Sequence, residues 1–259
     1  MNLGIKNKRI LITGASRGIG AEIARQFSNE GSQISLIARN EGNLKSILKK
    51  IGGTKAGHDY LSLDLREKGA PSQAVKELFD RHVDIDIVIH NVGGGLGIKD
   101  PMAKIDDWLN VLQFNVGIAI EMNNLILPHM IEKQWGRIIH ISSINAVTGG
   151  TMVEPYGGAP AYSCAKAYLN MYIKVVGREL AKNNVIISGV MPGTTISDGK
   201  HWDKLQKTNP ELVKDYLERY QAIGRFGRAE EIAPFVLLLS SEQASFASGS
   251  VLPVDGGML

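Results

Sequence analysis

The sequence predicts an α/β fold in which a doubly wound, mostly parallel sheet of seven strands is covered by helices on both faces. Short apolar runs alternate with helical patterns along all 259 residues, no internal repeat or low-complexity linker interrupts them, and a glycine-rich turn joins the first run to the first helix. The expected strands are residues 9–13, 33–38, 59–63, 85–90, 137–142, 185–190 and 251–254. We expect one domain spanning residues 1–259.

The first expected strand, residues 9–13, leads directly into a turn that contains Gly14, Gly18 and Gly20 and then into a helical pattern. Strand, glycine turn and helix are the context of a dinucleotide-binding fingerprint, although the spacing is G-x-x-x-G-x-G rather than G-x-G-x-x-G. Glycine lets the backbone approach a pyrophosphate, and the helix N-terminus offers N–H donors. The turn therefore indicates a dinucleotide site.

The second expected strand, residues 33–38, indicates which dinucleotide is bound. An acidic residue about 20 positions after the glycine turn would bind the ribose 2′-OH of NAD, whereas an arginine accommodates the 2′-phosphate of NADP. Here that position holds Arg39, and Arg17 inside the turn is a second cation within reach of the same phosphate. The sequence therefore favours NADP, with NAD as the alternative.

Tyr162 and Lys166 lie four positions apart at the start of another expected helix. Side chains at i and i+4 share one face of a helix, so the phenol and the ammonium would lie side by side. We expect the ammonium to lower the pKa of the phenol from its ordinary value of about 10. A tyrosine of this kind suits the acid/base chemistry of carbonyl–alcohol interconversion.

The candidate groups share one location in the expected fold. The glycine turn, Asn91, Ser143 and Pro192 each follow the carboxyl end of an expected strand. In open α/β sheets, ligands bind in the crevice outside these strand ends. We therefore expect one site rather than several.

These motifs together resemble the short-chain dehydrogenase/reductase family, which implies a doubly wound Rossmann fold. The resemblance covers essentially the whole chain. It rests on Thr13-Gly14-x-x-x-Gly18-x-Gly20, Asp64-Leu65, His90-Asn91-Val92-Gly93, Asn115, the strand running to Ser143, Tyr162-x-x-x-Lys166, Met191-Pro192-Gly193 and Val254-Asp255-Gly256-Gly257. His90 and Val92 depart from the usual asparagine and alanine; we expect His90 to be packed or to lie beside the ribose rather than to act as a base.

The resemblance implies a catalytic set of Asn115, Ser143, Tyr162 and Lys166. Tyr162 would give a proton to the carbonyl oxygen, while Lys166 would lower the pKa of Tyr162 and hold the nicotinamide ribose. Ser143 would hydrogen-bond the substrate oxygen, and Asn115 would hold a water that links Lys166 to solvent. The family's serine is the later of such a pair, so Ser142 is expected to be a satisfied strand-end hydroxyl.

The resemblance also implies a cofactor-binding set. Asp64 would lie against the adenine ring, backbone around Thr195 would meet the carboxamide, and Ser197 would meet the pyrophosphate. The full set is Gly14, Ser16, Arg17, Gly18, Ile19, Gly20, Arg39, Asp64, Leu65, Asn91, Gly93, Tyr162, Lys166, Pro192, Gly193, Thr195 and Ser197. No Cys/His cluster has metal-ligand spacing, so no metal site is expected.

Two segments are expected to select the substrate. The loop 144–161 is longer than the usual family spacing, and both its ends adjoin expected catalytic residues. Segment 196–224 is interpreted as a helical lid with aromatic residues and lysines. The lysines of the lid would suit an acidic carrier protein, whereas Glu154 in the loop favours a specialised polar substrate, and both interpretations stay open.

The function that the resemblance implies is an NAD(P)-dependent oxidoreductase that transfers a hydride between nicotinamide and a carbonyl/secondary-alcohol pair. A 3-oxoacyl-carrier-protein reductase is one specific alternative. Epimerisation or dehydration is disfavoured because the chain ends soon after Asp255-Gly256-Gly257. A non-catalytic NADP-binding sensor or scaffold is disfavoured because such relatives often lose the tyrosine, lysine or serine.

The amino-acid composition limits which binding partners and which cellular compartment are expected. The chain has 44% hydrophobic residues and a formal net charge of +3, which is too small and dispersed to indicate nucleic acid binding. No run of about 20 apolar residues and no signal-peptide core is present. The single cysteine, Cys164, is expected to be a small buried residue, and its isolation suits the cytoplasm. The family implies a homotetramer or homodimer, formed in part by long helices expected at about 102–134 and 162–181.

Overall fold

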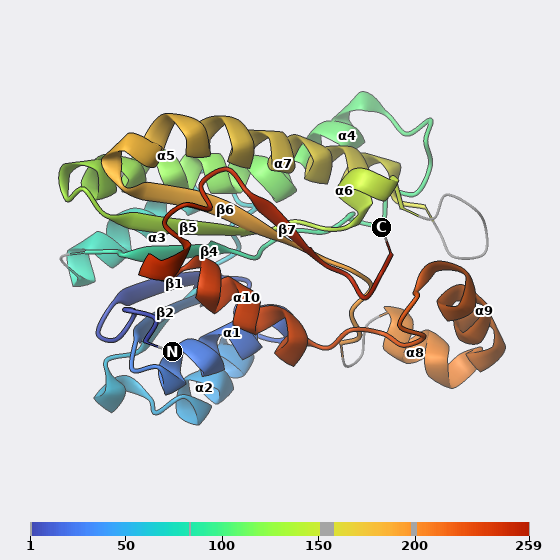
Figure 1. The fold of residues 1–259 in the computed structure, drawn as a ribbon, viewed down its shortest axis with the longest axis horizontal. Helices are drawn as coiled ribbons and strands as arrows, with labels where there is room; N and C mark the ends of the chain where they lie inside the picture. Colours follow the sequence, from blue (N-terminus) through green and yellow to red (C-terminus); the bar gives the residue numbers. More distant parts are fainter. Residues whose placement is uncertain (1, 83, 151–157, 198–200, 259) are drawn as a thin grey trace.

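The computed structural model describes residues 2–82, 84–150, 158–197 and 201–258 (Figure 1). These residues form a seven-stranded sheet with the order β3-β2-β1-β4-β5-β6-β7. The strands are β1 (Arg9–Thr13), β2 (Gln33–Ala38), β3 (Asp59–Ser62), β4 (Ile87–His90), β5 (Gly136–Ile141), β6 (Val185–Pro192) and β7 (Val251–Val254). All neighbouring strands in this sheet are parallel. The predicted doubly wound α/β Rossmann fold is confirmed, and its sheet is parallel throughout rather than mostly parallel.

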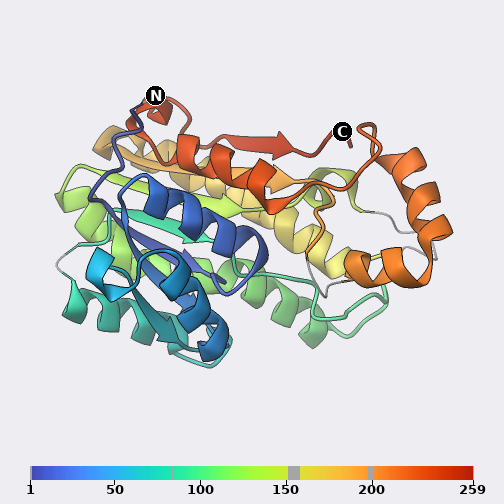
Figure 2. The same ribbon diagram turned by 90° about the horizontal axis from the view of Figure 1, so that it is seen from below.

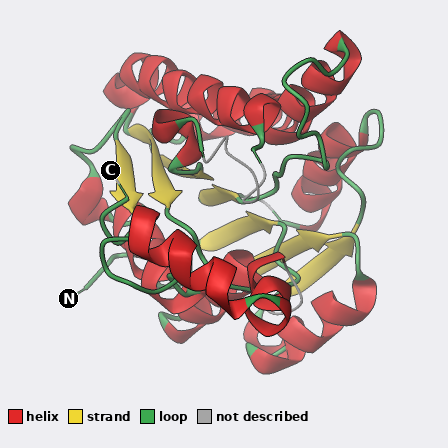
Figure 3. Cartoon of the chain, turned by 90° about the vertical axis from the view of Figure 1, so that its right-hand side faces the viewer, coloured by secondary structure: helices red, strands yellow, loops and turns green. Residues whose placement is uncertain are grey.

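Helices cover both faces of the sheet, because successive side chains of a strand point to opposite faces. On β1, Ile10 and Ile12 belong to one core, whereas Leu11 between them belongs to the other. The first core is covered by α1 (Gly18–Asn29), α2 (Glu41–Lys50) and α10 (Ala229–Leu239), which lie in front of the sheet in Figure 2. The second is covered by α3 (Ala70–Arg81), α5 (Ile118–Glu132) and α7 (Pro160–Leu180). Figure 3 shows the two layers on either side of the strands.

The long helix expected at about 102–134 is interrupted. It consists of α4 (Ile105–Leu112), the π-helical segment η2 (Gln113–Gly117) and α5. The side-chain amide of Gln113 occupies the space where a Cβ on Gly117 would lie. π-helical turns inside helices are frequent at functional sites, and this one contains Asn115.

Two helices stand beyond the carboxyl ends of β6 and β7, at the right of Figure 1: α8 (His201–Thr208) and α9 (Pro210–Tyr220). They lie within the segment expected to be a lid and are called the lid helices below. Their apolar side chains form a small cluster of their own around Val213, Tyr216 and Phe226. The remaining short elements are η1 (Thr54–Ala56), α6 (Asn145–Thr148), η3 (Ala181–Asn183) and η4 (Glu242–Ala244). Among the described helices, none combines the length and apolar character needed to cross a bilayer.

Candidate functional site

The glycine turn after β1 and the segment after β4 meet where the strand order reverses, because β1 lies between β2 and β4. Asn91 ties the two together. Its Nδ2 donates to the carbonyl oxygens of Thr13 (3.2 Å) and Gly14 (3.1 Å), and its backbone N–H donates to Oγ1 of Thr13 (3.0 Å). A crevice at such a switch point is the usual ligand site of an open α/β sheet.

The glycine turn brings its backbone close to the cleft. Gly14 and Gly18 have φ angles of 67° and 55°, in the left-handed region that favours glycine. A Cβ on Gly20 would lie 2.6 Å from both the Gly14 carbonyl oxygen and Nδ2 of Asn91. No side-chain hydrogen bond caps the start of α1 at Arg17. Backbone N–H groups at this helix end are therefore available to an anion.

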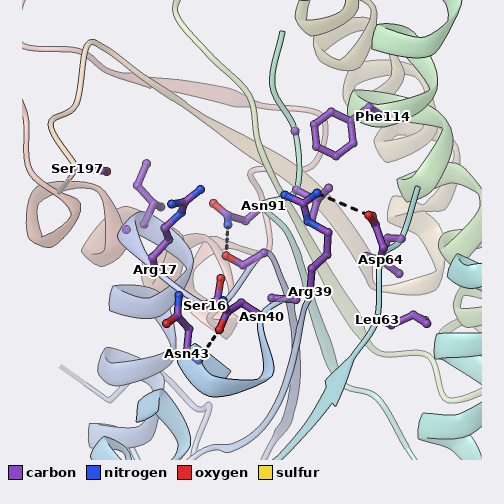
Figure 4. Close-up of a pocket in the computed structure, with 17 residues that line it drawn as sticks. Ser16, Arg17, Arg39, Asn40, Asn43, Leu63, Asp64, Asn91, Phe114 and Ser197 are labelled. Atoms are coloured by element: carbon purple, nitrogen blue, oxygen red, sulfur yellow. Dashed lines mark hydrogen bonds and ion pairs between the residues drawn. The ribbon is translucent and has the colours of Figure 1, made fainter. Parts of the chain in front are cut away.

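A cavity of about 700 Å³ opens over this turn (Figure 4). The expected cofactor-binding residues that line it are Gly14, Ser16, Arg17, Gly18, Ile19, Arg39, Asp64, Leu65, Asn91, Gly93 and Ser197. The lining also includes Ala38 and Val92, which the sequence placed near the cofactor without assigning them to the set, and four residues that the sequence reasoning missed: Asn40, Asn43, Leu63 and Phe114. One of them could have been found from the sequence, since Asn40 lies two positions after β2 and is a favoured capping residue; it caps α2 by accepting from the N–H of Asn43 at 2.8 Å.

A smaller cavity of about 240 Å³ lies next to the first and shares Ile19, Asn91 and Gly93 with it. Its other lining residues are Ile141, Ser142, Ser143, Tyr162, Lys166, Pro192, Gly193 and Thr195. The structure thus brings together residues that follow β1 and β4 with residues of β5, β6 and α7 at one edge of the sheet. Of the expected site residues, Gly20 and Asn115 line neither cavity.

The charged end of the larger cavity contains a chain of ion pairs. Nη1 of Arg39 lies 3.6 Å from Oδ2 of Asp64, and Nη2 of Arg66 lies 2.6 Å from the same oxygen. The Arg66 guanidinium is the main reason that the pKa of Asp64 falls to about 2. Asp64 is therefore a carboxylate, and Arg39, whose side chain is 59% exposed, reaches it from the cavity wall (Figure 4).

Lys166 is a buried amine with one backbone partner. The residue is 3% exposed, and its Nζ donates to the Ile141 carbonyl oxygen at 2.7 Å. Nζ lies 5.6 Å from the centre of the Tyr162 ring. Burial lowers the pKa of Lys166 to about 7, because loss of water disfavours the ammonium. Near neutral pH this amine therefore exchanges between its charged and neutral forms.

The pKa of Tyr162 moves in the direction opposite to the one expected. Burial raises the pKa of Tyr162, and interaction with the Ser143 side chain acts in the lowering direction but is the smaller effect. The prediction that Lys166 lowers this pKa is wrong in this structure. The physical reason is that Lys166 is itself desolvated, with its Nζ directed to a backbone carbonyl.

The two neighbouring serines differ in their partners. Oγ of Ser142 donates to Oδ1 of Asn170 at 2.5 Å, which confirms the prediction of a satisfied hydroxyl. Oγ of Ser143 accepts from the N–H of Asn145 at 3.2 Å and faces the smaller cavity. Ser143 is thus held by a local turn, whereas Ser142 is tied to α7.

Asn115 uses its side chain to hold the glycine loop that follows β4. Its Nδ2 donates to the carbonyl oxygens of Gly94 (2.9 Å) and Val111 (2.8 Å), and its Oδ1 accepts from the N–H of Gly94 (3.0 Å). A Cβ on Gly93 would lie 2.5 Å from this Oδ1 and 3.1 Å from Nζ of Lys166. The amide therefore fixes the loop that separates it from Lys166.

His90 is packed in the interior, which confirms the first of the two expectations for it. Its Nε2 donates to Oδ1 of Asn123 at 2.8 Å, and its ring stacks on His140 with the ring centres 4.8 Å apart. Burial lowers the pKa of His90 to about 4. The expectation of a buried Cys164 is wrong: this thiol is exposed, because its position on α7 faces away from the sheet.

Parts of the two expected substrate segments lie outside the described residues. These are residues 151–157 of the loop 144–161, with Glu154, and residues 198–200 of the segment 196–224. The described remainder contains α6 and the start of α7 in the first segment, and the two lid helices in the second.

Comparison with known proteins identifies several similar chains. The family model for the short chain dehydrogenase matches residues 8–207. The 3-oxoacyl-[acyl-carrier-protein] reductase FabG of Aquifex aeolicus is 31% identical over 261 residues, covering 100% of both chains. A crystal structure of L-sorbose reductase from Gluconobacter frateurii, complexed with NADPH and L-sorbose, superposes with a TM-score of 0.90 at 30% identity, covering 100% of this chain and 99% of that one. A 3-oxoacyl (acyl-carrier-protein) reductase from Agrobacterium tumefaciens C58 with NADP bound gives 0.87 at 28% identity, covering 98% and 95%.

Proposed function

The chain belongs to the short-chain dehydrogenase family, and from this premise we propose that it is an NADP-dependent reductase of a small-molecule carbonyl compound. The main observation in support is that Ser143, Tyr162 and Lys166 line one cavity together with the turn at Pro192 and Gly193. That cavity adjoins the larger cleft over the glycine turn.

The residues of the larger cleft fit a dinucleotide phosphate. Gly14 and Gly18 line the cleft with φ angles of 67° and 55°, and the start of α1 presents N–H groups to it. Arg17 and Arg39 line the same cavity and supply two cations for a 2′-phosphate. The relatives of known structure that were crystallised with NADP or NADPH support this choice over NAD.

The proposed chemistry divides among the catalytic residues. When bound, the nicotinamide supplies a hydride to the carbonyl carbon. Tyr162 donates its phenolic proton to the carbonyl oxygen, and Ser143 donates a hydrogen bond to the same oxygen as charge develops. Lys166, which lines the same cavity, holds the ribose hydroxyls. Asn115 positions Lys166 through the loop at Gly94, and its water-holding role stays a prediction.

The identity of the carbonyl substrate has two candidates. The names of the similar reductases favour a 3-oxoacyl group on a carrier protein. The lid helices favour a free small molecule, because three of their basic side chains are paired with acids, including Lys207, one of the lysines expected to attract an acidic carrier. These pairs are Lys207 with Asp203 (2.9 Å), Lys214 with Glu218 (4.0 Å) and Arg219 with Asp215 (2.7 Å).

The assembly of the protein is part of the proposal. A homotetramer or homodimer is supported by exposed apolar side chains on α4 and α7, including Ile105 and Met171. A sensor or scaffold role is disfavoured because the full set of Asn115, Ser143, Tyr162 and Lys166 is retained. The cytoplasmic location stays a prediction from the sequence.

Fluorescence titration of the purified protein with NADPH and NADH tests the cofactor assignment. We expect tighter binding of NADPH, and we expect Arg39→Ala to weaken NADPH binding by about 10- to 100-fold through loss of a charge-assisted contact, with NADH unaffected. Arg66→Ala is the matched control, because Arg66 pairs with Asp64 but does not line the cavity. An unchanged preference for NADPH over NADH in Arg39→Ala would refute the 2′-phosphate contact. Failure of the parent protein to bind either nucleotide would refute the proposed reductase function.

A further inference from the structure

Helix α7 carries the polar side chains of Tyr162, Lys166 and Asn170 at successive intervals of four residues. Residues spaced in this way lie along one face of a helix, and α7 packs beside β6 (Figure 1). Tyr162 and Lys166 line the smaller cavity of the proposed active site, whereas Asn170 lines neither that cavity nor the larger cleft. The proposed mechanism therefore leaves the third polar residue of this face without a role.

The side-chain amide of Asn170 joins α7 to the ends of two strands. Its Oδ1 accepts from Oγ of Ser142 at 2.5 Å, and its Nδ2 donates to Sδ of Met191 at 3.1 Å. Both partners are buried. Ser142 is the neighbour of Ser143 after β5, and Met191 is the neighbour of Pro192 at the end of β6. Since Ser143 and Pro192 line the smaller cavity, one amide holds the chain next to two residues of the site.

The chemistry of these partners fixes which way the amide points. A thioether sulfur accepts hydrogen bonds but cannot donate them, so it faces the NH2 group and leaves Oδ1 of Asn170 for Ser142. Because Oδ1 carries no hydrogen, the hydroxyl of Ser142 is the donor. The backbone N–H of Ser142 donates to the carbonyl oxygen of Val190 on β6 at 2.8 Å. Ser142 is thus held by α7 through its side chain and by β6 through its backbone.

Lys166 also bonds α7 to β5, through its Nζ and the Ile141 carbonyl oxygen at 2.7 Å. In the proposed mechanism this amine holds the ribose hydroxyls, so its bond to the strand competes with its part in the reaction. Leu169 and Ile173 are buried further along α7, but their apolar contacts have no preferred direction. The two bonds of Asn170 involve none of the groups assigned to the reaction, so they can hold the helix throughout turnover.

We propose that Asn170 is a positioning residue, whose amide fixes α7 against the ends of β5 and β6 and so sets the place of Tyr162 relative to Ser143. This inference rests on the proposed reductase function and adds a residue to it. Without the amide, α7 and the strand ends can shift against each other while Tyr162 and Ser143 are both still present. A displacement of about 1 Å can lower a rate by about 100-fold, so a residue outside the cavity can control kcat.

Asn170→Leu keeps the approximate size of the side chain but removes both of its hydrogen bonds. With the best substrate among 2-hexanone, a ketohexose and the acetoacetyl thioester of pantetheine, we expect its kcat to fall by about 10- to 100-fold. The Kd of NADPH, measured by fluorescence titration, should stay nearly unchanged, because Arg17 and Arg39 line the other cavity. At saturation, the nicotinamide emission of bound NADPH should fall, because the turn at Pro192 would immobilise that ring less firmly.

Three further variants separate positioning from a general loss of folding. Ser142→Ala removes only the bond to Oδ1 of Asn170, so its kcat should fall by about two- to tenfold. The double variant Asn170→Leu/Ser142→Ala should lose no more than Asn170→Leu alone, because the two residues share one bond. Asn124→Leu makes the same change at an exposed asparagine of α5 and is the matched control, in which all three measurements should stay unchanged.

The outcomes separate this inference from the proposed function. Unchanged kcat and nicotinamide emission in Asn170→Leu would overturn the inference while leaving a working reductase. A double variant whose loss of kcat equals the product of the two single losses would also overturn it, because the two side chains would then act independently. If Asn170→Leu does not fold, Ser142→Ala decides, and parent-like kcat and emission in that variant would overturn the inference. If the parent protein binds NADPH but reduces none of the three compounds, the proposed reductase function fails, and the nicotinamide emission still decides whether Asn170 orders the site.

Discussion

The cleft over the glycine turn and the region around the lid helices differ in how their polar side chains are used. The amides of Asn91, which lines the cleft, and of Asn115, which lies behind it, are bonded to backbone of the protein itself. At the C-terminal end of α9, Oε1 of Gln221 has no partner among the described residues. The first region is therefore assembled in advance, whereas the second keeps one buried acceptor without a donor among the described residues. Preorganisation of the cleft reduces the cost of ordering on binding.

Tyr162 lies in the cavity between these two regions, and its substitution is expected to have the largest effect. Tyr162→Phe removes the proton donor while keeping the ring, so kcat should fall by about 10³-fold. The affinity for NADPH, measured by fluorescence titration, should stay nearly unchanged because the cleft is assembled without the phenol. Tyr168→Phe, on the same helix but 53% exposed, is the control and should retain full activity. Preserved turnover in Tyr162→Phe would contradict the acid/base assignment.

The glycine turn can be disrupted without touching the lid. A Cβ in Gly20→Ala would lie 2.6 Å from the Gly14 carbonyl oxygen and from Nδ2 of Asn91, so the turn and the end of β4 must move apart. We expect a loss of about 1–3 kcal/mol in the free energy of unfolding and at least about tenfold weaker NADPH binding. Urea denaturation and nucleotide titration measure the two effects.

Gly42→Ala provides the control for this glycine. Gly42 lies in α2 with an ordinary φ, and the nearest atom to its Cβ would be Oδ1 of Asn40 at 3.5 Å. Alanine should therefore stabilise the protein by about 0.5–1 kcal/mol, as expected inside a helix. Equal losses in both variants would show that the close approach at Gly20 does not matter.

The same two regions show what can be predicted from the sequence. Many residues of the cleft were predictable because they follow strand ends, and the strands could be identified from short apolar runs. Asn43 and Phe114 were missed because they lie on helical elements. Gln221 was not predictable, because its side chain depends on contact with Asp255, 34 positions away. The direction of the Tyr162 pKa was also missed, since a four-residue spacing reveals which side chains are neighbours but not how deeply they are buried. The π-helical segment at Asn115 was missed for a related reason: helical periodicity does not show a single widened turn.

Protonation of the buried histidines behind the cleft is expected to have the smallest effect. It lowers the free energy of unfolding only at acidic pH. The pKa of His90 is lowered by burial to about 4, and the pKa of His140, which stacks on it, is lowered for the same main reason. An unfolded chain takes up protons at these rings near pH 6.5, so it binds more protons than the folded chain between pH 6.5 and about 4. The resulting stability is complete above pH 6.5 and is lost as the pH falls through that window, by up to about 3 kcal/mol for His90.

Urea denaturation at pH 7.5 and pH 5 measures this loss. His90→Asn removes the titrating ring, so we expect it to be less stable than the parent protein at pH 7.5 but to lose less stability between the two pH values. His129→Asn is the control, because His129 is an exposed histidine on α5 and its replacement should leave the loss intact. An identical loss in His90→Asn and the parent protein would mean that acid acts elsewhere. The neutral, buried rings of His90 on β4 and His140 on β5 would then not be the source of the pH dependence of stability.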